Sequence, residues 1–441
     1  MIEWIRYFGF PAYLALVAVM ALYVALAGLV VGLFATRSVA SPLLTAAAWV
    51  VSQALLNRWP FGGFPWAEVG VALHDVPAAR ALAGVGGVAL VTFATVALAG
   101  FVADLAVALR DRERRPAAWA GAGVVLVLAT TVVVNVTRFV PHRTGDLRIA
   151  VLQGDDEELS LAGQRSQRLT DDHLALAAKL RGHYDLIVFP EGALDTDPEQ
   201  DPALREAITS LAREHHASVL VNARVPVDRE AAANGTDDRI YNANLLYQPD
   251  GTLQGEYAKQ HLVPFGEYVP LRGVFGNLDA LRTNVPYDYT PGDKTVVFDV
   301  KGTPVGSVIC FESAFGPLVR DQVRAGAQAI VVSTNNRSYR RSGNTDQHLA
   351  LGQLRAAETA RPVVQASVSG ISAVIDADGN VHHPTKLFEK AILDTRIVTT
   401  RGDTLYVRFG EWVVWACALG LLAAAAVATL RRRQSATTAG G

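Results

Sequence analysis

The stretch VGSVICFESAFG, which runs from Val305 to Gly316, decides how this chain folds. It begins as a short apolar run that favours a buried strand over Gly306–Ile309, and Cys310 follows where that run ends. In folds that alternate strands and helices, reactive side chains gather just past the carboxyl ends of the strands. The stretch therefore predicts a buried strand that carries the thiol of Cys310 to such an edge, with the carboxylate of Glu312 beside it.

Two earlier stretches are built in the same way. LIVFPEGA (186–193) places Glu191 after a strand-like run, and GEYAKQHLVPFGEYVP (255–270) carries Lys259 and Glu267. Taken singly, a buried cysteine, a carboxylate at a helix start and a hairpin lysine each have a structural explanation. Together they supply a nucleophile, a base and a positive partner for an oxyanion, so we expect Glu191, Lys259 and Cys310 to form one catalytic site.

The region around these stretches predicts an α/β fold. Strand-like runs alternate with amphipathic helical stretches such as 167–180 and 346–359. Turn signals at Pro249-Asp250-Gly251 and at Asp378-Gly379 predict two hairpins, so the sheet should be mixed. The predicted strands are 148–153, 185–189, 218–222, 306–309, 329–333 and 363–367.

The composition of the 441-residue chain indicates a membrane part as well. Half of the residues are hydrophobic, which excludes a single small soluble fold. The net charge of −2, with charged residues spread along the chain, argues against nucleic acid as a partner. Five uncharged stretches have about the length that crosses roughly 30 Å of hydrocarbon. They are Tyr7–Thr36, Ser38–Asn57, Ala81–Ala103, Pro116–Thr137 and Trp412–Leu430.

The second of these stretches is the weakest, because Pro42 and Gln53 interrupt it and a buried helix of a soluble protein has a similar pattern. The segment that follows it, Trp59 to Trp66, mixes helix breakers with aromatic residues. It predicts either a re-entrant or surface loop, or a simple tight connection.

The arginines predict how the chain is oriented. Arg110, Arg112, Arg114 and Arg115 precede the fourth stretch and Arg431, Arg432 and Arg433 follow the fifth, so both clusters should be cytoplasmic. We then expect an N-terminal membrane region (1–138), an extracytoplasmic catalytic domain (145–410), a final membrane helix (411–433) and a polar tail (434–441). Trp412 and Trp415 suit the membrane interface.

Counting back through four spans places Met1 outside, without the pattern of a cleavable signal peptide. We therefore expect further membrane segments upstream of Met1, or a partner membrane protein that supplies them.

The two cysteines lie in different surroundings and are not expected to pair, which leaves Cys310 free for chemistry while Cys417 packs inside a span. The adjacent pairs His215-His216 and His382-His383 lack the spacing of a metal site and are interpreted as surface residues.

In this order, the three reactive stretches resemble the Glu, Lys, Cys triad of the nitrilase superfamily. With flanking spans, the chain is most similar to the apolipoprotein N-acyltransferase family. The shared motifs are GFPW (63–66), Gln153-Gly154, FGEYVP (265–270), and Gln347-His348 after Thr334-Asn335. The resemblance implies an α-helical membrane bundle plus a nitrilase-like α/β domain, the latter a four-layer αββα sandwich.

The resemblance also implies roles for the residues. Glu191 is the expected base, a thioester on Cys310 the expected intermediate, and Lys259 with the backbone N–H of Phe311 the expected oxyanion donors. Glu267 and Glu312 are expected to support them. The implied reaction moves a fatty acyl chain from a phospholipid donor to the N-terminal amine of a diacylglyceryl-modified apolipoprotein at a bacterial plasma membrane. It requires no metal and no cofactor.

Two departures from the family pattern stand out. Residues 336–341 read NRSYRR where the family often carries bulky aromatics, and Phe311 replaces a common tyrosine. Two other functions remain open at this point. One is a membrane-tethered amidase that uses water as acceptor, and the other is a non-catalytic scaffold for a glycosyltransferase that acts on lipid-linked sugars.

Overall fold

The computed structural model describes residues 2–33, 41–155, 162–276 and 285–439. The chain divides into two compact units. One unit is Val140–Asp403, and the other combines Ile2–Phe139 with Thr404–Gly441.

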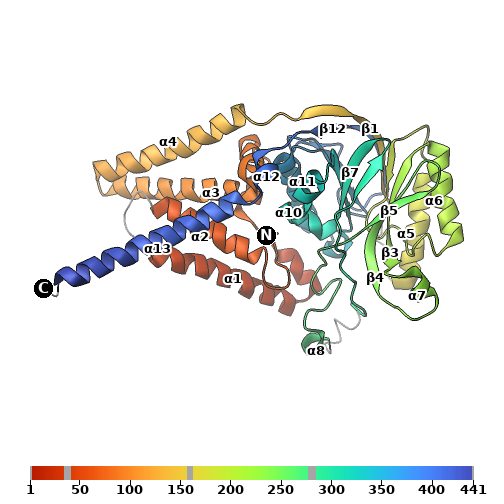
Figure 1. Ribbon diagram of the computed structural model, residues 1–441, viewed down its shortest axis with the longest axis horizontal. Helices are drawn as coiled ribbons and strands as arrows, with labels where there is room; N and C mark the ends of the chain where they lie inside the picture. Colours follow the sequence, from red (N-terminus) through yellow and green to blue (C-terminus); the bar gives the residue numbers. More distant parts are fainter. Residues whose placement is uncertain (1, 34–40, 156–161, 277–284, 440–441) are drawn as a thin grey trace. The chain divides into compact units, whose positions relative to one another are not determined.

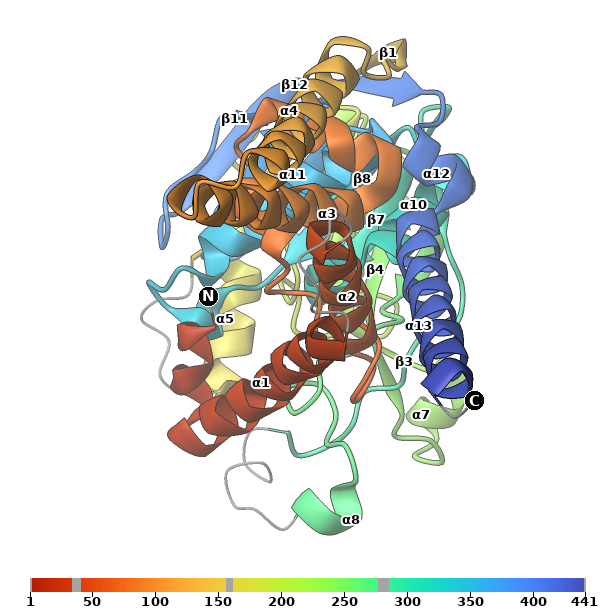
Figure 2. The same cartoon turned by 90° about the vertical axis from the view of Figure 1, so that its left-hand side faces the viewer.

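The second unit is built from apolar helices: α1 (Phe10–Leu33), α2 (Ser41–Leu56), α3 (Pro77–Arg110), α4 (Arg114–Val136) and α13 (Trp412–Ala439). Within the described residues, four helices are long and apolar enough to cross a membrane, namely those that cover Phe10–Gly32, Pro77–Arg110, Arg114–Val136 and Trp412–Arg431. The weakest predicted span forms α2, whose 16 described residues make it a shorter apolar helix. Helices α3 and α4 lie side by side in both views (Figures 1 and 2).

The second half of the segment between α2 and α3 is packed into this unit, whereas Trp59 is 69% exposed. Its Trp66 is 4% exposed and meets the ring of Trp4 at 5.4 Å between centroids. A short 3-10 helix, Val69–Leu73, then crosses α3 closely. The backbone N–H of Gly70 donates to the Thr92 hydroxyl at 3.0 Å, and a Cβ at Gly70 would lie 2.8 Å from a carbonyl oxygen of α3.

Helix α3 is interrupted at Gly86 and Gly87, where the backbone leaves helical geometry. Such a break frees carbonyl groups that need another donor. The indole Nε1 of Trp412, at the start of α13, donates to the Val85 carbonyl at 3.0 Å. A side chain at Gly86 would place its Cβ 2.5 Å from Val413, so glycine permits the close approach of α13 to α3.

Among the described residues, the first unit contains two six-stranded sheets (Figure 1). The strand order of one is β12-β1-β2-β3-β4-β5 and of the other β11-β10-β9-β8-β7-β6. The first sheet uses β1 (His142–Gln153), β2 (Leu186–Val188), β3 (Ser218–Pro226), β4 (Ile240–Tyr247), β5 (Leu253–Ala258) and β12 (Ala391–Arg401). The second uses β6 (Val297–Val300), β7 (Thr303–Ile309), β8 (Ala329–Thr334), β9 (Val363–Ser367), β10 (Ala373–Ile375) and β11 (Val381–His382).

Both sheets are mixed, as the predicted hairpins require. The neighbours β1, β2 and β3 are parallel, as are β7, β8 and β9, whereas the outer strands of each sheet pair antiparallel. The long strand β12 pairs with β1 from His142 opposite Arg401 to Gln153 opposite Ala391. Sequence analysis missed β12 and β6. The latter was missed although Lys301-Gly302, where both residues have positive φ, forms the turn that joins it to β7.

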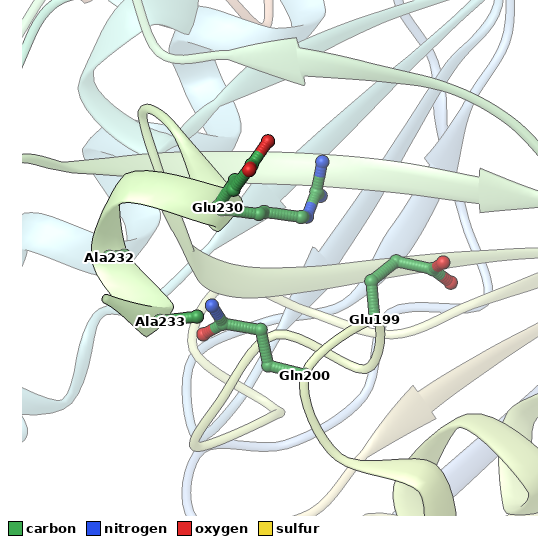
Figure 3. Close-up of a pocket in the computed structure, with 6 residues that line it drawn as sticks. Glu199, Gln200, Glu230, Ala232 and Ala233 are labelled. Carbon is green, nitrogen blue, oxygen red and sulfur yellow. The ribbon is translucent and has the colours of Figure 1, made fainter. Parts of the chain in front are cut away.

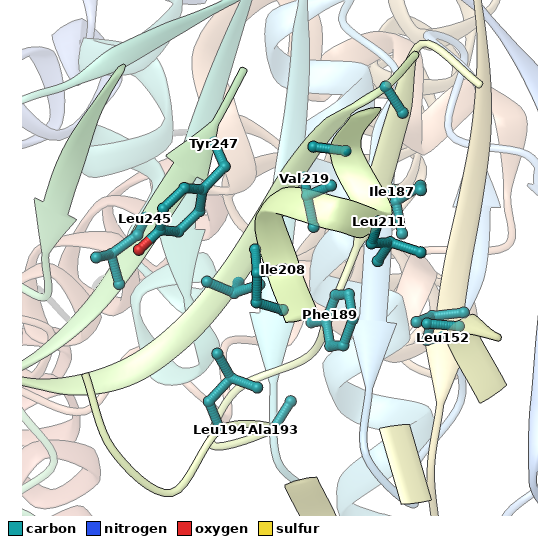
Figure 4. Packing of buried hydrophobic residues seen from close by; sticks show 14 of the residues in the cluster. Leu152, Ile187, Phe189, Ala193, Leu194, Ile208, Leu211, Val219, Leu245 and Tyr247 are labelled. Carbon is teal, nitrogen blue, oxygen red and sulfur yellow. The ribbon is translucent and has the colours of Figure 1, made fainter. Parts of the chain in front are cut away.

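Alternate residues of β1 show how the layers form. Ile149 and Val151 join a buried cluster that contains residues of both sheets, whereas Ala150 and Leu152 face a second cluster with helices α5 (Ala162–Ala177) and α6 (Pro202–His215). Figure 4 shows this second cluster, in which Leu211 and Ile208 of α6 lie over Val219 and Ile187. Helices α10 (Gly316–Arg324) and α11 (Asn344–Thr359) contact β7 and β9 of the other sheet. The expected helix–sheet–sheet–helix sandwich is confirmed.

One interpretation of the histidine pairs was wrong. His215 is 3% exposed, and its Nδ1 lies 2.7 Å from the Gly182 carbonyl oxygen. It occupies the last turn of α6, where the chain turns inward before β3, while its neighbour His216 is exposed.

Candidate active site

The three predicted site residues each lie within three residues of a strand end. Glu191 comes three residues after β2, Lys259 directly follows β5, and Cys310 directly follows β7. Because β2, β3 and β5 point the same way, the ends of β2 and β5 lie on one edge of the first sheet. Strand β7 brings Cys310 from the facing sheet, and this residue belongs to the cluster between the sheets.

Lys259 lies between two carboxylates. Its Nζ is 3.2 Å from Oε1 of Glu191 and 2.9 Å from Oε1 of Glu267, and its side chain is 1% exposed. Burial alone lowers the pKa of a lysine, but the charges of Glu191 and Glu267 outweigh it and raise the pKa of Lys259 well above its ordinary value. The ammonium group therefore stays charged at neutral pH.

An asparagine that sequence analysis did not single out joins the same cluster. The Nδ2 group of Asn242, on β4, donates to Oε1 of Glu191 and to Oε1 of Glu267, both at 2.8 Å. Its own Oδ1 accepts from Asn222 at 2.9 Å, and Oδ1 of Asn222 accepts from the backbone N–H of Gly192 at 2.7 Å. The turn that carries Glu191 is thus fixed from both sides. The sequence signal that could have identified Asn242 is the set of polar residues at inward positions of two strand-like runs, NARVP (222–226) and YNANLL (241–246).

The thiol of Cys310 is neutral at rest. Burial and, to a smaller extent, the Glu191 charge raise its pKa to about 12, although the Lys259 charge and hydrogen bonds from Thr334 and the Asn335 backbone lower it. At pH 7 such a thiol would be ionised in about one molecule in 10⁵. A base must therefore remove its proton as the sulfur attacks, and Glu191 is the carboxylate whose charge acts on it most strongly.

Glu312 joins the lysine turn to the cysteine turn. One of its oxygens accepts from the backbone N–H groups of Gln260 at 2.7 Å and His261 at 3.1 Å. The other accepts from the Ile309 N–H at 2.7 Å and the Tyr257 hydroxyl at 2.9 Å. Burial raises the pKa of Glu312 to about 7, although the donors and the Lys259 charge oppose this shift. The carboxylate holds two segments from different sheets together.

The segment 336–341, which departs from the family pattern, lies near the same site. Asn336 is buried. Burial raises the pKa of the Tyr339 hydroxyl, and the nearby charge of Glu191 raises it further. The guanidinium group of Arg341 lies 4.9 Å from the centre of the Phe388 ring.

Elsewhere on this unit, the structure has a cavity of about 660 Å³ at the short helix α7 (Arg229–Ala233). Figure 3 shows Glu199 and Gln200 opposite Ala233 and Glu230. No residue of the triad lines it, and Arg229 is already paired with Asp197 at 2.6 Å and with Glu256 at 2.8 Å.

Comparison with known proteins gives matches along most of the chain. The carbon-nitrogen hydrolase family model matches residues 148–403, and the model of the apolipoprotein N-acyltransferase N-terminal domain matches residues 1–101. An apolipoprotein N-acyltransferase of Geobacter metallireducens is 30% identical over 84% of this chain and 71% of its own length. The same enzyme of Methylococcus capsulatus is 34% identical over 90% of this chain and 75% of its own.

Among solved structures, an amidase from Nesterenkonia sp. is 20% identical, with a TM-score of 0.44, over 62% of this chain and 97% of its own.

Proposed function

Because this chain belongs to the apolipoprotein N-acyltransferase family, we propose that it moves a fatty acyl chain from a phospholipid to the N-terminal amine of a lipidated cysteine in apolipoproteins. The observation that carries the proposal is the buried cluster of Lys259 with two carboxylates beside the neutral thiol of Cys310. Helices long and apolar enough to cross a membrane, in the same chain, suit a donor that resides in a bilayer.

In the first half-reaction, the sulfur of Cys310 attacks the ester carbonyl carbon as Glu191 accepts the thiol proton. The carbonyl oxygen becomes an oxyanion, which the ammonium group of Lys259 and the backbone N–H of Phe311 stabilise. Collapse of this intermediate breaks the ester C–O bond. The leaving alkoxide takes the proton from Glu191, which yields lysophospholipid and an acyl thioester on Cys310.

In the second half-reaction, the acceptor amine attacks the thioester carbonyl carbon. Glu191 accepts a proton from the nitrogen, and the same two donors stabilise the second oxyanion. Collapse breaks the C–S bond, and the proton on Glu191 returns to the sulfur. The products are an amide and the neutral thiol, so the reaction is ping-pong. Glu267 and Asn242 hold Lys259 and Glu191 in place throughout.

For the membrane arrangement, we propose that the arginine clusters at 110–115 and 431–433 face the cytoplasm of a bacterial plasma membrane. The domain that holds the site (145–410) is then extracytoplasmic, between a membrane region (1–138) and a final span (411–433). Thiol-labelling with a membrane-impermeant reagent tests this in Cys310→Ala, Cys417→Ala chains: a cysteine at Arg112 should be labelled only after the membrane is opened, and one at Glu214 in intact spheroplasts.

The acyl thioester itself is the test of the function. Purified protein incubated with a phospholipid that carries a labelled acyl chain should gain one label, which hydroxylamine releases and which Cys310→Ala lacks. Cys417→Ala should keep it. An unlabelled native protein would contradict acyl transfer. Turnover of a small soluble amide without lipid would support the amidase alternative, and complementation by Cys310→Ala would support the scaffold.

A further inference from the structure

A buried histidine on α11 contacts the turn that carries the thiol. His348 is fully buried, and its Nε2 lies 3.1 Å from the carbonyl oxygen of Cys310 and 2.8 Å from the hydroxyl of Ser313. The same hydroxyl donates to the Cys310 carbonyl at 2.9 Å. Two side chains therefore converge on one carbonyl oxygen, that of the proposed nucleophile. The chemistry above gives His348 no role.

The neighbours of His348 decide which of its nitrogens carries the proton. Its Nδ1 lies 3.1 Å from Nδ2 of Asn336, and 3.3 Å from the Thr334 hydroxyl, which itself donates to the Asn336 amide. That amide is oriented by two further contacts, because its Nδ2 donates to Asn344 at 3.0 Å and its Oδ1 accepts from Ser367 at 3.3 Å. Nδ1 of His348 faces a donor and must accept, so the proton of the neutral ring is on Nε2. Burial lowers the pKa of His348 to about 4, which keeps the ring neutral at pH 7.

The carbonyl that His348 holds belongs to the same peptide unit as the N–H of Phe311. A trans peptide is planar, and its C=O and N–H point in opposite directions. When the carbonyl oxygen of Cys310 is fixed, the direction of the Phe311 N–H is fixed as well. A hydrogen bond to the carbonyl also polarises the peptide and strengthens its N–H as a donor.

This peptide needs outside support, because Cys310 has a φ of +52°. The left-handed region costs a residue with a side chain about 1 kcal/mol. The backbone preference of Cys310 alone would therefore favour another conformation of this turn. Contacts from α11 and from the 3-10 turn Cys310–Ala314 oppose that rotation.

We propose that His348 is a positioning residue that aims the Phe311 N–H at the oxyanion by holding the Cys310 carbonyl. The inference rests on the proposed function for the identity of the acyl donor, but not for the geometry. This role differs from a role in activating the thiol. Loss of the Nε2–H of His348 should weaken stabilisation of the oxyanion and leave the nucleophile in place.

The experiment compares His348→Leu, which lacks a donor, with His348→Gln, whose amide N–H can take the place of Nε2–H. Both are made in a Cys417→Ala chain, so that Cys310 is the single thiol. Two rates are measured on the full chain in detergent: alkylation of Cys310 by iodoacetamide, which forms no oxyanion, and formation of the acyl thioester from phospholipid.

We expect His348→Leu to lower kcat for thioester formation by about 10²- to 10³-fold, the usual effect of losing one oxyanion donor, with KM for the phospholipid nearly unchanged. Alkylation should change by no more than about threefold, since the thiol keeps its surroundings. His348→Gln should recover at least about tenfold of the lost rate.

His173 supplies the matched control. It is equally buried in the same unit, and its pKa is likewise lowered to about 4, but its Nδ1 contacts the Leu169 carbonyl of α5. His173→Leu should lower thermal stability and leave the ratio of the two rates unchanged. If alkylation and thioester formation fall together in His348→Leu, or if thioester formation does not fall, the inference is overturned.

An activated ester separates this inference from the proposed function. Should the native chain form no thioester from phospholipid, the same rates are measured with p-nitrophenyl butyrate, which forms a thioester through the same oxyanion. A selective loss in His348→Leu then supports the positioning role although the lipid donor is wrong, and the absence of any thioester overturns both.

Discussion

Asn242 donates one hydrogen bond to each of two carboxylates that also share the ammonium group of Lys259. Two buried like charges so close together repel each other. The amide adds a second donor at the same two oxygens, Oε1 of Glu191 and Oε1 of Glu267, without adding a charge. Asn242 therefore helps Lys259 to hold the two carboxylates together.

Replacement of this amide should therefore slow the reaction. Asn242→Leu removes the donor that joins Glu191 to Glu267 beside Lys259. We expect the rate of thioester formation to fall by about 10- to 100-fold, the usual effect of losing hydrogen bonds to charged groups. A native rate would mean that Asn242 serves packing alone.

Removal of the base should have a larger effect. Glu191→Gln keeps the size of the side chain but cannot accept the thiol proton, and the thiol with its pKa of about 12 does not ionise by itself. Thioester formation should fall by on the order of 10² to 10⁴ while the fold is kept. Glu214→Gln, at an exposed position of α6, is the control and should leave the rate unchanged. A Glu191→Gln protein with native rates would remove Glu191 from the mechanism.

At the scale of elements, the arrangement is fixed by hydrogen bonds at the ends of strands and by close packing where helices cross. The turns after β5 and β7 are joined through Glu312, and the turn after β2 through Asn222 and Asn242. In the helical unit, Gly70 and Gly86 allow close packing that any side chain would block: Gly70 against the backbone of α3, and Gly86 against the side chain of Val413.

Gly70→Ala tests one of these contacts. Its Cβ would lie 2.8 Å from the Val88 carbonyl oxygen and 2.9 Å from the Val88 side chain, so the 3-10 helix would have to move away from α3. We expect a loss of about 1–3 kcal/mol, visible as a lower melting temperature in detergent. Gly28→Ala in α1, where nothing lies within 4 Å of the added Cβ, should not lower it. Equal effects at both positions would contradict close packing at Gly70.

At the scale of the whole molecule, two buried neutral histidines make stability depend on pH. Burial lowers the pKa values of His173 and His348 to about 4. In the unfolded chain a histidine titrates near 6.5, so below that pH the unfolded state binds protons that the folded state does not. The contribution of these two histidines to the free energy of unfolding is therefore complete above about pH 6.5, and it is lost as the pH falls toward 4. Glu312, with its raised pKa of about 7, acts in the opposite direction between pH 7 and 4.5.

A comparison with His173→Leu isolates one histidine from these opposing groups. Protonation of His173 would place a second donor at Nε2, which has no hydrogen-bond partner among the described residues. The native chain should lose up to about 3 kcal/mol more than the variant between pH 6.5 and pH 4. The difference between their melting temperatures in detergent should therefore shrink over that range. A constant difference would mean that His173 does not titrate on unfolding.

Local pattern was sufficient for much of this protein. Short apolar runs that end in a reactive residue indicated the strands that lead to Glu191, Lys259 and Cys310, because a buried strand needs continuous apolar side chains whatever its partners are. The long uncharged stretches indicated the apolar helices for the same reason. Turn residues placed the two hairpins, and the order of motifs indicated the family.

Only the tertiary structure decided which polar residues meet. Asn242 and His348 carry no local signal, because an asparagine in a strand and a histidine in a helix are ordinary until distant segments surround them. The partners of His348 come from the turn after β7, the end of β8 and the loop that follows it, which adjoin α11 only when the second sheet has formed. Hydrogen bonds across such distances in the chain depend on the packing of whole layers, which no local stretch of sequence encodes.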